Sequence, residues 1–124
     1  MDDKNLIQKD LIKKIVGDAR GAVGIRLCAI GVNLGIFENL AKRGPATSQE
    51  LADRMKLDER YLREWGLGMF SLGYLNFDKI SRKLSLNKEF IPVLVEEGGM
   101  FSQKGLIEIL NSSLLPYHEL LDCF

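Results

Sequence analysis

The stretch that decides the fold runs from Gly44 to Leu86 and reads GPATSQELADRMKLDERYLREWGLGMFSLGYLNFDKISRKLSL. Gly44 and Pro45 end the segment before them, because proline disfavours helical conformation at the residue that precedes it. Beyond this break, turn-forming residues divide the stretch into three apolar parts. The division predicts two short helices followed by a β-hairpin.

Both helices have start signals. Thr47 and Glu50 have the spacing of a capping box, in which each side chain accepts a hydrogen bond from the backbone N–H of the other residue. Asp58 is placed to cap the second helix. One apolar stripe with helical spacing follows in that helix: Leu62, Trp65, Met69 and Leu72. Gly73 comes directly after the stripe and is placed to stop the helix.

Residues 74–77 and 84–86 are β-prone and enclose a polar middle. They predict a hairpin with a loop of about four to six residues. Two helices and a hairpin in this order outline a winged helix. We therefore expect a mainly α fold with a small β-hairpin, a winged helix-turn-helix flanked by additional N- and C-terminal helices. Its predicted structural core contains Phe37, Leu51, Leu62, Trp65, Leu72 and Leu75.

Two helical segments are predicted before the winged helix. Residues 3–16 form an amphipathic helix whose apolar face includes Ile7, Leu11 and Ile15. Gly17 and Asp18 are expected to break it, and residues 19–41 return to helix in one piece or two. The second segment is rich in small residues: Ala19, Gly21, Ala22, Gly24, Ala29, Gly31 and Gly35. Either glycine joints kink this helix, or another helix packs very close to it.

Three further helical segments are expected after the hairpin, at residues 88–97, 101–110 and 114–124. Pro92 confines or kinks the first, and Pro116 fits the first turn of the last. The apolar residues of these end helices, with Leu106, Leu110 and Leu114 among them, exceed what a small winged-helix core can cover. They must cover each other, another subunit or a missing domain. The apolar C-terminus indicates a fragment of a longer protein.

Charge restricts the function classes. The chain has 124 residues with 17 basic and 17 acidic side chains, so its net charge is zero. A nucleic-acid-binding domain of this size is more often basic. The second helix of the winged helix begins with a net negative charge, which suits phosphate binding poorly. A DNA-binding winged-helix transcriptional regulator therefore stays as the alternative function, and nucleic acid is not the expected partner.

The sequence predicts a soluble, cytoplasmic protein without a membrane segment. The start, MDDKNLIQKDLIKK, is too acidic and too interrupted for a signal peptide. The longest uncharged apolar run near the start, residues 27–37, falls far short of the ~20 residues that a membrane span needs. Cys28 and Cys123 form no disulfide framework.

No catalytic constellation is found in the sequence. His118 is the single histidine, and no Cys/His cluster accompanies it. Gly66-Leu67-Gly68 begins like a phosphate-binding loop but has Ser71 in place of the last glycine and lies inside a helical pattern. We therefore expect no catalytic, cofactor-binding or metal-binding residue. Gly66 and Gly68 weaken their helix by about 1 kcal/mol each, and we expect another helix to approach closely there.

Residues 35–75 resemble the N-terminal winged-helix domain of class I S-adenosylmethionine-dependent methyltransferases. The motifs that carry the resemblance are Leu34-Gly35-Ile36-Phe37, Gly44-Pro45-Ala46-Thr47, Glu50-Leu51-Ala52, the run DERYLREW at residues 58–65, and Gly73-Tyr74-Leu75. Leu86-Asn87-Lys88-Glu89 is similar to the segment that leaves the wing. The resemblance covers about half of the chain.

The resemblance implies a function without catalysis. In such methyltransferases this domain dimerises through interleaved flanking helices and forms part of the lid over the substrate pocket. The cofactor site lies in a following Rossmann-like domain, and this sequence has no matching glycine-rich loop. S-adenosylmethionine is thus implied for the parent protein and no cofactor for this chain. A small enzyme in its own right is a third reading, which the missing chemistry disfavours.

The resemblance also implies a homodimer and a division of the chain. Residues 1–33 are expected to be dimerisation helices, residues 34–87 the winged-helix core, and residues 88–124 the helices that lead to an absent catalytic domain, all within a single domain 1–124. The predicted dimer interface includes Ile7, Leu11, Ile15, Leu106, Leu110 and Leu114. The methyl acceptor cannot be predicted from these residues.

Overall fold

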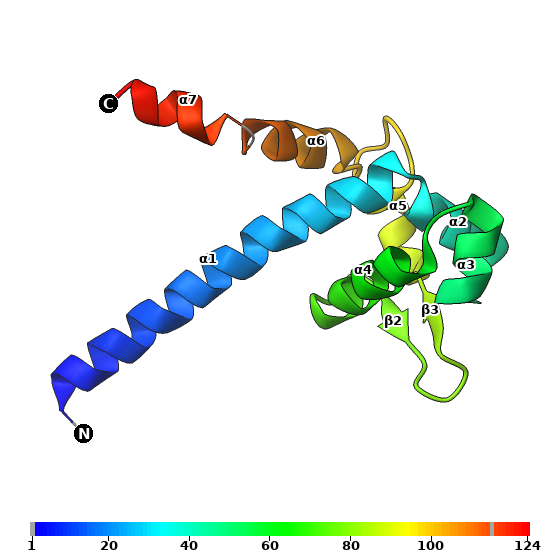
Figure 1. The fold of residues 1–124 in the computed structure, drawn as a ribbon, viewed down its shortest axis with the longest axis horizontal. Helices are drawn as coiled ribbons and strands as arrows, with labels where there is room; N and C mark the ends of the chain where they lie inside the picture. Colours follow the sequence, from blue (N-terminus) through cyan, green and yellow to red (C-terminus); the bar gives the residue numbers. More distant parts are fainter. Residues whose placement is uncertain (1, 115) are drawn as a thin grey trace.

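The structure, a computed structural model, describes residues 2–114 and 116–124. Its helices are α1 (Asp3–Asn33), α2 (Ile36–Arg43), α3 (Ser48–Met55), α4 (Glu59–Ser71), the 3-10 helix η1 (Lys88–Phe90), α5 (Ile91–Leu94), α6 (Lys104–Ser113) and α7 (Tyr117–Asp122). Its strands are β1 (Ala46–Thr47), β2 (Asn76–Phe77) and β3 (Lys83–Ser85). Helices α2, α3 and α4 and the sheet form one body, from which α1 projects (Figure 1). The predicted fold class is confirmed.

The hairpin belongs to a three-stranded antiparallel sheet with the order β1-β3-β2. Ala46 and Phe77, on the two outer strands, both pair with the buried Leu84 of β3. The predicted hairpin is confirmed, and residues 78–82 form its loop. Strand β1 was not predicted, because two residues beside a capping box are too few to show the alternation that marks a strand.

The predicted helix caps are confirmed. The Thr47 hydroxyl accepts a hydrogen bond from the Glu50 N–H at 3.1 Å, and the Glu50 carboxylate accepts one from the Thr47 N–H at 2.8 Å. The Asp58 carboxylate accepts hydrogen bonds from two N–H groups of the first turn of α4. Gly73, with φ +87°, follows α4 in the left-handed conformation that ends a helix.

The core lies between α1, α4 and the short helices. Of the residues predicted for it, Phe37, Leu51, Leu62, Trp65 and Leu75 are buried. Leu72 is only half-buried, so its prediction as a core residue is wrong. The reason is its position as the C-cap of α4, where the chain leaves the helix and Leu72 faces Gly24 at the edge of α1.

The first helix is longer than predicted. A break at Gly17 and Asp18 was expected, but α1 continues through both residues. An ion pair between Lys14 and Asp18, with 2.7 Å between the charged atoms, spans the expected break, and an interior glycine weakens a helix without ending it. The chain turns instead at Gly35, which takes a left-handed φ of +73° between α1 and α2.

Within residues 19–41 each of the two readings holds at a different glycine: Gly35 is a joint between two helices, and Gly31 marks close packing. A Cβ on Gly31 would lie 2.5 Å from the Phe37 ring and 2.6 Å from the Trp65 ring. A Cβ on Gly68 would lie 3.2 Å from Leu27 of α1, as the expectation of a close helix requires. At Gly66 that expectation is wrong, because the close neighbour is a side chain of strand β3, Leu84.

The C-terminal helices are shorter and shifted relative to the prediction. Helix α5 ends at Leu94, and the next helices are α6 and α7. The expected break at residues 111–113 is wrong, because these residues continue α6. Pro116 is the N-cap of α7 rather than part of its first turn. Helix α6 ends at Ser113 and α7 begins at Tyr117; Leu115, which lies between them, is outside the described residues.

Candidate functional site

The outer half of α1, residues 3–23, is an exposed helix with an apolar face. Most of its length projects away from the body (Figure 1), and near its inner end the Arg20 guanidinium donates a hydrogen bond to the Ser71 carbonyl of α4 at 3.2 Å. The predicted interface residues Ile7, Leu11 and Ile15 are 69%, 56% and 58% exposed. Further large apolar side chains of this half are also exposed: Leu6, Ile12, Val16 and Val23. A helix with this much uncovered apolar surface indicates an interaction partner.

The inner part of α1 has the opposite character. From Gly24 onward the helix contributes buried residues to the core, including Cys28 and Ala29. The change from exposed to buried therefore falls inside one continuous helix, ten residues before the expected boundary at 33/34. The Trp65 indole N–H donates a hydrogen bond to the Leu27 carbonyl at 2.9 Å, which attaches α4 to this inner part.

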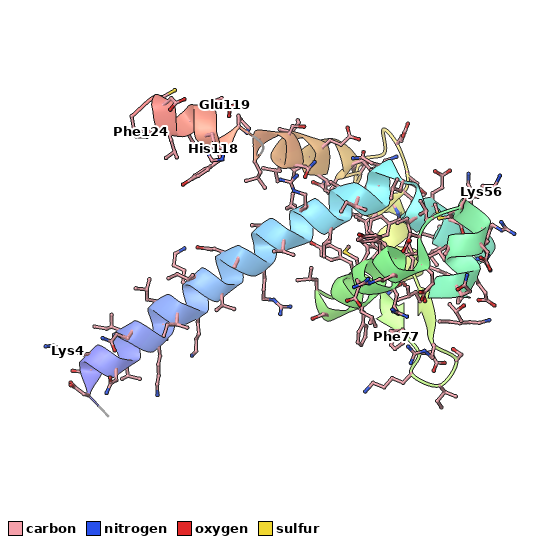
Figure 2. All side chains as sticks on the ribbon, in the orientation of Figure 1. Lys4, Lys56, Phe77, His118, Glu119 and Phe124 are labelled. Carbon is pink, nitrogen blue, oxygen red and sulfur yellow. The ribbon has the colours of Figure 1, made fainter. Side chains whose placement is uncertain are left out.

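Helix α6 lies along α1 and extends the exposed apolar surface. Ile107 is 5% exposed and attaches α6 to the core. The predicted interface residues Leu106, Leu110 and Leu114 remain exposed on α6 and at its end. Helix α7 adds Leu120 and Leu121, and Phe124 follows it; all three are exposed. The outer half of α1 and the pair α6–α7 diverge and leave both apolar faces uncovered, with their side chains standing free (Figures 1 and 2).

The total surface area supports a missing partner. The chain exposes 8888 Å². A compact monomer of 14.0 kDa exposes about 6,700 Å². The excess of roughly 2,200 Å² falls within the ~1,000–2,500 Å² that one subunit contributes to an obligate homodimer interface. The uncovered helices therefore account for enough surface to form a stable association.

The described residues contain no group of His, Cys, Asp and Glu side chains that could hold a metal ion. The His118 ring lies edge-on to the ring of its neighbour Tyr117, with 5.7 Å between the ring centroids, on the exposed α7. Burial raises the pKa of the Cys28 thiol to about 11, and a hydrogen bond with Tyr74 offsets part of that rise. Cys28 is therefore a neutral thiol at physiological pH and not an activated nucleophile.

One arginine on the surface that a winged helix uses to bind DNA is paired with a carboxylate. A cavity of about 220 Å³ lies between α3, α4 and the hairpin, with Arg63 and Arg82 in its lining. The Arg63 guanidinium already donates to the Glu59 carboxylate at 3.4 Å, and Ser48 donates to the same oxygen at 2.7 Å. The carboxylate at the start of α4 thus neutralises the arginine that would face a phosphate.

Among the helices that the structure describes, none is by itself long and apolar enough to cross a membrane. The pair α1 and α2 meets the criterion of length and composition together, but the two helices are bent by 62° at their junction.

The order of helices, the capped α3 and α4 and the three-stranded sheet define a winged helix-turn-helix domain. Residues 21–95 match the model of the Rv2258c-like winged HTH domain, and the chain belongs to this family. The matched range begins close to the point where α1 enters the core and ends just after α5. Residues 3–20 of α1 and the helices α6 and α7 lie outside it.

Solved structures of methyltransferases contain the same fold. The structure of PigF with SAH has a TM-score of 0.71 at 15% identity and covers 90% of this chain and 32% of its own. The structure of mitomycin 7-O-methyltransferase MmcR has a TM-score of 0.68 at 18% identity and covers 92% of this chain and 32% of its own.

A third structure has a higher sequence identity. The apo form of the S-adenosylmethionine-dependent methyltransferase SibL has a TM-score of 0.54 at 26% identity and covers 61% of this chain and 22% of its own. The chain thus spans about a third or less of the length of these structures. No curated protein sequence matches the chain. The resemblance to the winged-helix domain of S-adenosylmethionine-dependent methyltransferases is confirmed.

Proposed function

We propose that this chain is the non-catalytic N-terminal domain of an S-adenosylmethionine-dependent methyltransferase. Its role is to form a homodimer and to cover the substrate pocket of a catalytic domain that lies beyond these 124 residues. The observation that carries the proposal is a complete winged helix from which two apolar helical arms extend uncovered. One arm is the outer half of α1, and the other is the pair α6–α7. The length ratio to the similar methyltransferases supports it.

The two arms have different parts in this proposal. The outer half of α1 carries the face with Ile7, Leu11 and Ile15, which joins the second subunit. Helices α6 and α7 lead toward the catalytic domain, and their exposed leucines cover it or the second subunit. S-adenosylmethionine binds to the catalytic domain and not to this chain.

Calorimetric titration of the 124-residue chain with S-adenosylmethionine tests the assignment of roles. No heat of binding is expected up to millimolar cofactor, because the proposal assigns the cofactor site to the catalytic domain. Saturable binding at micromolar concentration would show that the chain is more than a dimerisation domain.

A mobility experiment with the same 124-residue chain distinguishes a DNA-binding regulator from a methyltransferase domain. Its mobility with a mixed-sequence duplex DNA is expected to stay unchanged at low salt, since Arg63 is neutralised by Glu59. A shift that weakens steeply with added salt would indicate phosphate contacts and favour the DNA-binding alternative.

A further inference from the structure

The outer half of α1 carries a stripe whose residues are arranged symmetrically about Leu11. Ile7 and Ile15 lie four residues before and after it, and Lys4 and Asp18 lie seven residues before and after it. A helix turns by about 100° per residue. All four residues therefore lie within about 40° of Leu11 around the helix axis, on one face of α1, which is helical throughout this range.

This arrangement is what a two-fold antiparallel helix pair requires. In an isologous contact, residue i of one subunit meets residue j of the other, and j meets i. If two copies of α1 cross in opposite directions at Leu11, Leu11 meets its own copy. Ile7 then meets Ile15 of the second subunit, and Lys4 meets Asp18.

The charges choose between the two possible directions. A parallel pair would place Lys4 against Lys4 and Asp18 against Asp18, which is unfavourable. An antiparallel pair places each ammonium beside a carboxylate. Asp18 also accepts an ion pair from Lys14 within its own helix at 2.7 Å, but a carboxylate has lone pairs for more than one donor. Both Lys14 and Asp18 remain well exposed.

The stripe also has the surface that a contact needs. From Lys4 to Asp18 it is about 21 Å long, at a rise of 1.5 Å per residue. Its apolar centre is more than half exposed at Ile7, Leu11 and Ile15. In Figure 2 this end of the helix, marked by Lys4, lies far from the rest of the molecule. The excess surface of the chain, roughly 2,200 Å², leaves room for a full interface.

We propose that α1 pairs with α1 of a second copy of this chain in an antiparallel arrangement, with the two-fold axis at Leu11 and reciprocal ion pairs between Lys4 and Asp18. The inference rests on the proposed dimer and specifies its geometry. It names the residue at the axis and the pair of charges that sets direction and register.

Cross-linking tests the axis. Cys123→Ser removes the exposed thiol and leaves Cys28, which is buried. In that background, Leu11→Cys is expected to give a covalent dimer with a short bismaleimide. Lys13→Cys, on the opposite side of the same helix, is the matched control and is expected to stay uncross-linked. Equal cross-linking of the two variants, or none with Leu11→Cys, would overturn the axis.

A second measurement covers the case in which Leu11→Cys itself weakens the dimer. Chains with Ile7→Cys and chains with Ile15→Cys, both in the Cys123→Ser background, are mixed and cross-linked. The antiparallel register predicts that the mixed product between the two variants exceeds either product of one variant with itself. A parallel pair predicts the reverse.

Charge exchange tests the ion pairs. Lys4→Glu and Asp18→Lys are each expected to raise the dimer dissociation constant roughly 5- to 30-fold, because two pairs per dimer become repulsive. The double variant is expected to return to within about 3-fold of the wild type. Asp10→Lys is the control. It loses a comparable exposed carboxylate, which lies 3.9 Å from Lys13, but it is on another face and should leave the constant unchanged.

The outcomes separate the two levels of the proposal. If the wild-type chain is a monomer by light scattering, the proposed dimer itself is wrong. If it is a dimer and the double variant remains as weak as the single variants, the dimer stands and the antiparallel register is wrong.

Discussion

The indole nitrogen of Trp65 donates a hydrogen bond to the backbone carbonyl of Leu27, 2.9 Å away. The two residues belong to α4 and α1, and the bond lies next to the place where the Phe37 ring packs against Trp65 at 5.5 Å between ring centroids. It fixes the inner part of α1 to the winged helix. Because α1 is one continuous helix, its outer half extends from the winged helix into solvent in one direction.

Trp65→Phe is expected to lower the free energy of unfolding by about 1–3 kcal/mol, because the hydrogen bond is lost and the smaller ring leaves a gap. Urea unfolding followed by circular dichroism at 222 nm measures the change. Tyr61→Phe, on the same helix but 77% exposed, is the control, with an expected change within about 0.5 kcal/mol. Equal effects of both substitutions would mean that the contact between α4 and α1 adds no stability.

Two glycines of α1 are expected to respond to alanine with opposite signs. At Gly31 the new Cβ would collide with the rings of Phe37 and Trp65, so Gly31→Ala should destabilise the fold by about 1–3 kcal/mol. At Gly21 no atom beyond the adjacent residues and backbone of α1 itself lies within 4 Å of the new Cβ, so Gly21→Ala should stabilise it by about 0.5–1 kcal/mol. Chemical unfolding of the two variants checks both signs, and a stabilising Gly31→Ala would contradict the described packing.

The capping box is expected to make stability depend on pH. The hydrogen bond from the Thr47 N–H lowers the pKa of Glu50 from 4.5. A carboxyl group with a lowered folded-state pKa stabilises the fold above its unfolded-state pKa, and that contribution is lost as the pH falls through the folded-state value. Glu50→Gln should therefore flatten the fall in Tm below about pH 5. Glu64→Gln, an exposed carboxylate of α4, should leave the slope as in the wild type.

Charges placed on the proposed interface are expected to separate the subunits. Leu11→Glu combined with Leu110→Glu should yield a monomer or an aggregate, because buried carboxylates without partners are costly. Ile80→Glu, at the tip of the hairpin where the side chain is 96% exposed, is the control and should leave the association state unchanged. Light scattering distinguishes the variants. An unchanged dimer with both interface substitutions would place the interface elsewhere.

Local signals predicted most of the winged helix. Thr47 with Glu50, Asp58 and Gly73 define where α3 and α4 begin and end, and they act through neighbours in the sequence. The continuity of α1 through Gly17 could not be predicted from the sequence. The free-energy cost of one interior glycine is smaller than the stabilisation that the helix gains from tertiary packing further along its length. Strand β1 depends on Leu84, which is distant in the sequence.

The sequence predicted which apolar residues belong to the candidate surface, but not where along α1 that surface ends. The sequence showed more apolar residues than the core could cover, and Ile7, Leu11 and Ile15 lie on the exposed arm. Where α1 changes from arm to core depends on the contacts of Gly24 and Gly31 with distant rings and side chains. Such contacts between distant residues have no local signature.

The solution mass of the 124-residue chain, measured by light scattering over a range of concentrations, tests the central claim most directly. A homodimer formed by the outer half of α1 predicts a mass of about 28 kDa, twice the 14.0 kDa of one chain, that falls only on strong dilution. A mass of 14.0 kDa that persists at high concentration would contradict the claim and leave the exposed arm without a second copy as its partner.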